Sequence, residues 1–247
     1  MNAQEEKVVV ASVSNVTPEW LKRRMGIMAE LDRQLIQAVK NPGTGLTLDQ
    51  LQLVTEHKNP FAINPENLLA DWYKFYRQEF IIEPGNVQIP PQQSGFDRLI
   101  VIVQGLTIQQ AYDRCADNFP CWKWTDGDLD GAVPTNDRSP NNGAYAIWVR
   151  DRVEADEELK NQSANKLQRD GIAGITLLER VIFELKYYKE TGKHLDIRNV
   201  TLCSGSRDAD GYVPDAGWHD DEFDVSYSHL GFAFDDLRAR QVVSSAR

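Results

Sequence analysis

The chain contains 247 residues, 41% of them hydrophobic and 26% charged, which suffices for one large or two small globular cores. Its 27 basic and 37 acidic residues give a net charge of −10, so nucleic acid is not an expected partner, because phosphate binding relies on a basic surface. No run approaches the roughly 18 consecutive apolar residues that cross a bilayer, and residues 1–6 lack the pattern of a secretory signal, so we expect no direct membrane insertion.

The first third of the chain is predicted to be helical. Residues 1–16 are polar and are expected to form a flexible N-terminus, followed by a helical region at 17–90. One helix begins at Pro18, with apolar residues every three or four positions, and two others begin near Thr47 and Pro65. Eight basic against nine acidic residues in this region argue against a DNA-reading helix-turn-helix, so we interpret these helices as packing elements.

A stretch rich in proline and glycine at 84–95 is predicted to link the helical region to a second domain, residues 96–247. Capping-box patterns at Thr107 and Thr176 predict the starts of its two helices. The predicted elements, in chain order, are a buried strand at 99–103, a helix at 107–117, a long loop at 120–143, a strand at 145–149, a helix at 176–190 that Gly192 ends, and a short strand at 200–203.

The acidic excess is concentrated near the C-terminus. Residues 205–236 hold nine acids and a single base, Arg207, whereas the rest of the chain holds 28 acids and 26 bases. Within this segment Phe223, Val225 and Tyr227 alternate with polar residues, which predicts a strand with one buried and one solvent-facing side.

The residues that follow this strand have neither helical nor strand periodicity. Residues 229–236 carry Leu230, Phe232 and Phe234 between polar groups and acids. An apolar cluster of this kind either marks a contact surface or folds under as a satellite core, and the pattern alone leaves both readings open. A closing strand is predicted at 237–243.

Several C-terminal segments resemble the variable proteins of diversity-generating retroelements, of the type found in archaea and their viruses. These segments are 201–207, 211–214, Trp218, the strand at 223–225, and 237–243. In that family a reverse transcriptase miscopies adenines, so that asparagine codons of the form AAY become NNY, which never encode Met, Trp, Gln, Lys or Glu. Residues 224–236 contain none of these five types, whereas Glu222 departs from the pattern and is interpreted as a fixed position.

The resemblance covers residues 96–247, with a hypervariable region at about 205–243. It implies the α+β class and a C-type lectin fold, in which a small twisted antiparallel sheet and two helices support long loops, here preceded by the helical N-terminal region. It further implies a non-enzymatic display protein that binds an unknown protein or cell-surface ligand, from a virion or a cell surface.

The resemblance also implies which residues are diversified and bind the ligand. These positions are Tyr212, Asp215, Gly217, His219, Asp224, Ser226, Ser228, His229, Gly231, Phe232, Phe234 and Asp236. The structural supports beneath them would be Phe223, Val225, Trp218 and Leu237. Whether Asp208, Leu230, Ala233 and Asp235 also vary depends on the template.

Residues 126–137 match much of a calcium-binding loop. The candidate ligands are Asp126, Asp128, Asp130 and Asp137. Pro134 and the aspartate in the last position depart from the pattern, and the alternative is a turn whose carboxylates accept hydrogen bonds from backbone amides. Calcium at this loop aside, no cofactor is expected.

The sequence leaves two other functions open, a lectin-fold enzyme of the formylglycine-generating type and a structural virion or assembly component. Such an enzyme needs a reactive cysteine pair, and Cys203 has no evident partner in the sequence, while Cys115 and Cys121 fit buried thiols. His219 and His229 lie among acids, a composition that would suit a catalytic pair but is also expected on any acidic surface. We therefore expect no enzyme.

Overall fold

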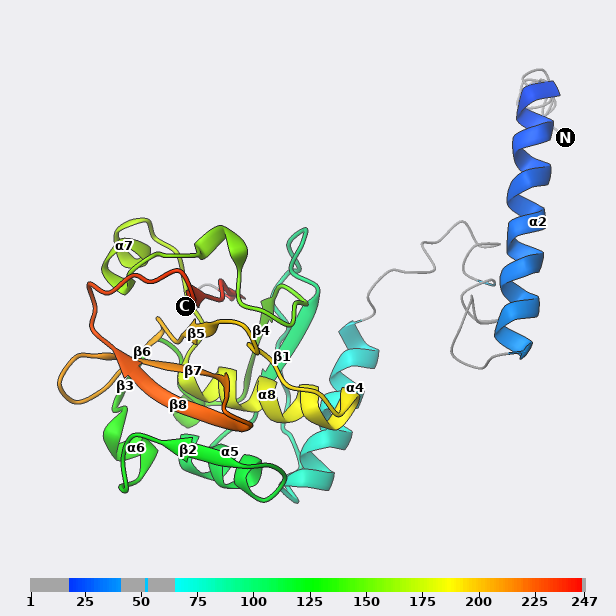
Figure 1. The fold of residues 1–247 in the computed structure, drawn as a ribbon. Coiled ribbons are helices and arrows are strands. Elements are labelled where there is room, and N and C mark those ends of the chain that lie inside the picture. The colour runs from blue at the N-terminus through cyan, green and yellow to red at the C-terminus, as the bar shows by residue number, and fades with distance from the viewer. Residues whose placement is uncertain (1–17, 41–51, 53–64, 246–247) are drawn as a thin grey trace, which may run out of the picture. The chain divides into compact units, whose positions relative to one another are not determined.

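A computed structural model describes residues 18–40, 52 and 65–245. The chain divides into two compact units, residues 1–63 and residues 64–247, each described separately below (Figure 1).

The first unit contains helix α2 (Pro18–Lys40), which begins at the expected proline. Leu21, Met25 and Met28 follow one another at helical spacing along it and are exposed. The helix expected near Thr47 lies outside the described residues. Among the residues described in either unit, none of the helices has both the length and the apolar character of a membrane span.

The second unit begins earlier in the chain than the sequence predicts. Helix α4 (Pro65–Glu79) was expected to belong with the N-terminal helices, but its Trp72 Nε1 and Tyr76 hydroxyl donate to the carbonyls of Leu99 and Val101, at 3.0 and 2.6 Å. The stretch predicted to be a linker also packs on this unit, because Trp148 Nε1 donates to the carbonyl of Pro90 at 2.8 Å. The units therefore divide at residues 63 and 64, not at the proline-rich stretch.

The second unit has the expected α+β composition, with three small sheets. The first sheet, in the order β1-β4-β10, consists of β1 (Arg98–Ile102), β4 (Tyr145–Val149) and β10 (Val243–Ser244), all antiparallel neighbours. The second, in the order β2-β8-β7-β5-β9, consists of β2 (Cys121–Lys123), β8 (Glu222–Ser228), β7 (Val213–His219), β5 (Val200–Leu202) and β9 (Leu237–Ala239). The third pairs β3 (Thr135–Asn136) with β6 (Ser206–Arg207).

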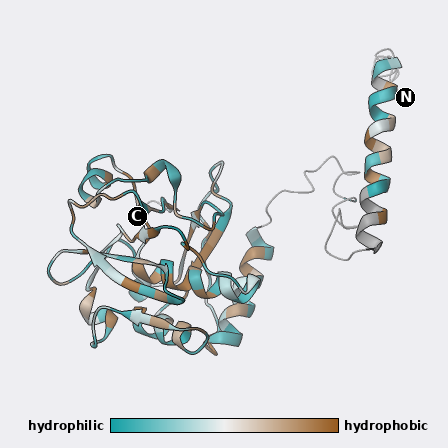
Figure 2. Ribbon diagram, viewed as in Figure 1, coloured by the Kyte–Doolittle hydropathy of each residue, from teal (hydrophilic) through white to brown (hydrophobic). Residues whose placement is uncertain are grey.

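Helix α8 (Leu177–Thr191) lies between the first two sheets and contacts both β1 and β7 (Figure 1). Its capping box at Thr176 and its left-handed end at Gly192, with a φ of 67°, are as predicted. Helix α5 (Ile108–Ala116) packs against it and also begins with the predicted capping box. Figure 2 shows hydrophobic residues concentrated in this interior, along β1 and β4.

Three parts of the unit differ from the sequence-based expectation. The segment at 120–143 is not one long loop, because β2, helix α6 (Leu129–Ala132), β3 and the 3-10 turn η1 (Pro140–Asn142) interrupt it. Strand β7 was not predicted, since its Pro214 and Gly217 are poor strand formers and only pairing with β8 and β5 defines it. Two short helical segments, η2 (Glu157–Leu159) and α7 (Ala164–Arg169), were also not predicted.

Candidate binding surface

The β7–β8 hairpin brings together half of the positions that the resemblance implies. Antiparallel pairing places Asp215 opposite Ser226 and Gly217 opposite Asp224, so these side chains share one face of the sheet. We call this the outer face, because the opposite face carries the fully buried Phe223 and Val225. His219 and Ser228 lie on the outer face as well, one at each end of the hairpin.

Asp215 does not point into solvent as expected. Its side chain is 8% exposed, and its Oδ2 accepts a hydrogen bond of 2.6 Å from the hydroxyl of Ser228. Burial raises the pKa of the Asp215 carboxyl to about 6, and the nearby charges of Asp224 and Asp236 act in the same direction, while the Ser228 bond opposes them. Asp215 pairs with Leu202 of β5, and Leu202 belongs to a small buried core together with Val213 and Leu237. The strand pattern alone did not reveal this environment.

Gly217 is also buried, contrary to expectation. A Cβ atom built on Gly217 would lie 2.9 Å from Nε2 of His219 and 3.2 Å from the carbonyl oxygen of Asn199. The imidazole could rotate away, but the backbone carbonyl could not, so only a glycine fits here without a shift of the chain. Asp215 and Gly217 therefore belong to the scaffold in this structure, whereas the other ten implied positions are half-buried or exposed.

Beyond Gly217 the outer face is more open. Asp224 and His219 are half-buried, and burial raises the pKa of the Asp224 carboxyl while the nearby His219 lowers it. Oδ1 of Asp224 and Nε2 of His219 are buried atoms that have no hydrogen-bond partner among the described residues. Trp122 of β2 pairs with Asp224 in the sheet and is 46% exposed.

Six aromatic side chains form a continuous row of ring contacts at the other end of the hairpin. Successive ring centroids are 4.4 to 5.8 Å apart. The row, named here the aromatic row, runs in the order Trp124, Tyr227, Tyr212, His229, Phe232 and Phe234. Tyr227, Phe232 and Phe234 are 43, 46 and 49% exposed, so nearly half of each side chain faces solvent.

Four members of the aromatic row were implied by the resemblance, and two were missed. Tyr227 was expected on the buried face with Phe223, but it lies near the end of β8, where its ring contacts those of Trp124 and Tyr212. Trp124 comes from the segment expected to be a loop and reaches β8 because its amide donates to the carbonyl of Val225 at 3.1 Å. No local pattern in the sequence signals that contact.

The loop at 229–236 is neither a satellite core nor an unsupported apolar cluster. The half-buried Leu230 packs against a small core that includes Leu167, Val213 and Leu237, and its carbonyl accepts a 3.1 Å hydrogen bond from the amide of Asn165 in α7. At the loop's other end the carbonyl of Asp236 accepts from the amide of Val200, at 2.8 Å. Both ends of the loop are thus fixed to the scaffold while its phenylalanines remain exposed.

Inside the loop, backbone turns complete the attachment. The amide of Phe232 donates to the carbonyl of His229, and that of Leu237 to the carbonyl of Phe234, at 2.9 and 3.2 Å. Gly231 is exposed with no atom near the position of a Cβ, so other residues have space there. The exposed phenylalanines are therefore held by backbone contacts that do not depend on their own side chains.

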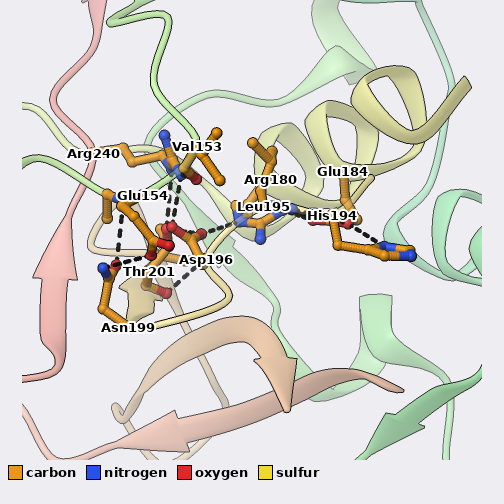
Figure 3. Close-up of polar contacts among 12 residues, drawn as sticks. Val153, Glu154, Arg180, Glu184, His194, Leu195, Asp196, Asn199, Thr201 and Arg240 are labelled. Atoms are coloured by element: carbon orange, nitrogen blue, oxygen red, sulfur yellow. Dashed lines mark hydrogen bonds and ion pairs between the residues drawn. The ribbon is translucent and has the colours of Figure 1, made fainter. Parts of the chain in front are cut away.

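A buried network of charges lies beneath the hairpin (Figure 3). Asp196 accepts hydrogen bonds from Nε of Arg180 and Nη2 of Arg240, at 2.9 and 2.7 Å, and Arg180 also pairs with Glu184 at 2.8 Å. All four side chains are 0–1% exposed. The backbone carbonyl of Asp196 accepts from the amide of Trp218 in β7, so the network connects α8 to the hairpin.

These opposite charges compensate one another in the interior. Burial by itself would lower the pKa of Arg180, but Asp196 and Glu184 raise it overall, so the guanidinium remains charged.

His194 connects this charge network to Trp218. Its Nδ1 lies 2.9 Å from Glu184, and its ring stacks on that of Trp218 with centroids 3.4 Å apart. The expected support Trp218 is thus held by stacking, although it is only half-buried.

Two of the four aspartates predicted to bind calcium, Asp128 and Asp130, accept hydrogen bonds from backbone amides. Asp128 caps α6 by accepting from the amides of Asp130 and Gly131, and Asp130 accepts from the first two amides of α5, those of Ile108 and Gln109. Within the described residues, no group of three or more His, Cys, Asp or Glu side chains is arranged to hold a metal ion. Asp128 and Asp130 thus make the contacts of the alternative reading, in which the carboxylates accept hydrogen bonds from backbone amides.

The three cysteines do not have the environment of reactive thiols. Cys115 and Cys203 are buried, and burial raises the pKa of both well above the ordinary value. Cys121 is half-buried, and burial together with nearby carboxylates raises its pKa to about 12. All three thiols are free, and their raised pKa values favour the protonated form at neutral pH.

Comparison with known proteins identifies no relative. The chain matches no protein-family model, no curated protein sequence and no solved structure.

Proposed function

We propose that residues 64–247 form a C-type lectin-like ligand-binding domain whose exposed hairpin and loop positions are diversified by a retroelement. The observation that carries the proposal is the aromatic row. Its exposed rings are those of Tyr227 on β8 and of His229, Phe232 and Phe234 on a loop that backbone hydrogen bonds fix near both ends. Exposed aromatic clusters on monomeric proteins usually mark contact surfaces, and rigid display of rings limits the entropy lost on binding.

The division between fixed and free positions supports the same proposal. Phe223, Val225 and Leu237 are buried, whereas Ser226 and His229 on the same segment are half-buried or exposed. A surface that tolerates many side chains needs this separation, since the fold must not depend on the residues that change. The proposed diversified set excludes Asp215 and Gly217, which are part of the interior.

We further propose that the domain is not an enzyme of the formylglycine-generating type. That chemistry requires reactive thiols, and burial raises the pKa of Cys115, Cys121 and Cys203. A binding role requires only the exposed side chains already described.

The proposal is tested with a library of the full chain in which six exposed or half-buried positions are encoded by NNY codons. These positions are Tyr212, Ser226, Ser228, His229, Phe232 and Phe234. We expect most members to fold, and selection on several unrelated immobilised proteins to enrich different sequences for each one. The matched control randomises Phe223, Val225 and Leu237, which are buried, and should give mostly unfolded protein.

Two results would contradict the proposal. If the exposed library unfolds as often as the buried control, these positions serve the fold and are not free to vary. If the exposed library folds but never yields binders, the surface is not a general ligand-binding site. The gene provides a separate test, since the proposal requires a nearby reverse transcriptase and a near-copy of the codons for residues 205–243 that differs only at adenines.

A further inference from the structure

We propose that the ligand of this particular sequence is a polypeptide segment rich in arginine or lysine, bound by the aromatic row and its neighbouring carboxylates. This inference rests on the proposed function, and it specifies the chemistry of the partner. It follows from two independent features of the surface, its charge and the exposure of its rings.

The charge of the segment has almost no compensation of its own. Residues 205–236 contain nine acids and one base, Arg207. Nη1 of Arg207 donates to the backbone carbonyls of Ser204 and Ser206, at 2.8 and 2.6 Å, so this guanidinium is bound to the main chain. A surface with one sign of charge raises the local concentration of ligands of the opposite sign and accelerates their association.

Four of these nine acids are close in the chain to members of the aromatic row. Asp235 and Asp236 follow Phe234 in the chain, and both are exposed. Oδ1 of Asp208 accepts from the amides of Asp210 and Tyr212, which places the exposed Asp210 in the turn that precedes Tyr212. Carboxylates therefore flank the row at Tyr212 and at its Phe234 end.

The rings themselves are free to accept a cation. Inside the protein, arginines already lie over aromatic rings, for example Arg150 over Phe96 at 4.4 Å and Arg180 over Phe223 at 5.3 Å. In the part of the chain that the structure describes, no such cation–ring contact involves a member of the aromatic row. Attraction to a cation at an exposed ring is modest, so several rings and carboxylates must act together.

Rings beside carboxylates select for arginine and lysine in a way that neither group does alone. Carboxylates alone would attract any small cation, and rings alone would bind any apolar group. Arginine and lysine have both a long apolar stem, which can lie on a ring, and a charged end, which can reach a carboxylate. A basic polypeptide presents several such side chains at once and can engage successive rings of the row.

The test measures binding of fluorescent peptides to the full chain by anisotropy at about 0.1 M salt. The probes are Gly-Arg, Gly-Ser and Gly-Glu repeats of equal length. We expect the arginine peptide to bind at least about tenfold more tightly than the other two, and its binding to weaken at 1 M salt, where screening is stronger. Absence of arginine-peptide binding, or equal binding of the serine peptide, would overturn the inference.

Two double variants separate the roles of rings and charges. Phe232→Leu with Phe234→Leu keeps apolar side chains but removes the aromatic faces, and should weaken binding of the arginine peptide by about five- to thirtyfold. Asp235→Asn with Asp236→Asn removes two charges at nearly constant shape and should weaken binding at 0.1 M salt more than at 1 M. An unchanged affinity in either double variant would refute the combined recognition.

The matched control for charge is Asp220→Asn with Asp221→Asn. These aspartates form the turn at the opposite end of the β7–β8 hairpin, and their φ values of 47° and 64° are ones that asparagine also tolerates. The seven residues of each strand place this turn about 20 Å from the row, beyond the screening length of about 10 Å. We expect this control variant to change the affinity for the arginine peptide by less than twofold. If it loses as much affinity as the variant with Asp235→Asn and Asp236→Asn, recognition by the carboxylates next to the aromatic row is refuted.

The two proposals fail in distinguishable ways. If the NNY library yields binders but the arginine peptide does not bind, the ligand chemistry inferred here is wrong and the display function stands. If the arginine peptide binds as expected but the library does not fold, the surface recognises cations without being diversifiable.

Discussion

The buried carboxylate of Asp196 offers the sharpest test of how the hairpin is supported. Its substitution Asp196→Asn keeps the size of the side chain, and asparagine tolerates the left-handed φ of 53° at this position. The change removes the only negative charge that contacts Arg240 among the described residues, and Arg180 retains Glu184. The variant therefore isolates the effect of one buried charge.

The expected cost follows from the burial of the partners. Arg240 is 1% exposed and would be left with neutral acceptors, the carbonyls of Arg152 and Val153 and the hydroxyl of Thr201. An uncompensated buried charge costs about 3–5 kcal/mol of unfolding free energy. For a unit of this size we expect the melting temperature to fall by roughly 6–20 °C.

Urea denaturation and thermal melts of the full chain provide the measurement. The control is Glu158→Gln, which breaks the exposed Arg152–Glu158 pair, 40 and 52% exposed, and should cost less than about 1 kcal/mol. Adding Arg240→Met to Asp196→Asn should recover part of the loss, because the unpaired charge is removed as well. A loss no larger than that of the control would refute the structural role assigned to the network.

Three further predictions concern the interior beneath the surface. Burial raises the pKa of Asp215 to about 6, whereas an aspartate in the unfolded chain titrates near pH 4. Between these two pH values the folded state binds more protons than the unfolded state. The contribution of Asp215 to the free energy of unfolding therefore decreases as the pH rises from about 4 to 6. Asp215→Asn should be more stable than wild type at pH 7, by about 2–3 kcal/mol in urea denaturation, and equal stability at pH 7 would contradict the assignment. Phe223→Ala, at a fully buried ring, should cost about 3–5 kcal/mol, and Phe234→Ala less than about 0.5 kcal/mol; equal losses in thermal melts would show that the loop ring is part of the core. The thiols of Cys115 and Cys203 should react with a thiol reagent at pH 8 only after denaturation, and rapid labelling of the native chain would show that they are accessible.

Part of the candidate site was predictable because its signals are local. The strand at 222–228 follows from the alternation of apolar and polar residues. The exposure of Phe232 and Phe234 agrees with the contact surface, which was one of the two readings left open for the loop at 229–236. Asp215 and Gly217 were misplaced because their burial comes from β5 and from the chain at Asn199, which no local pattern around β7 reveals.

By itself the sequence determined the elements whose causes lie within a few residues. Capping boxes and apolar spacing marked α5 and α8, apolar runs marked β1 and β4, and the charge count located the acidic segment. Only the tertiary structure decided that α4 packs on the second unit, that Trp124 and Tyr227 join the aromatic row, and that Asp215 is enclosed. These features arise from contacts between segments far apart in the chain, and such contacts depend on how the whole unit packs.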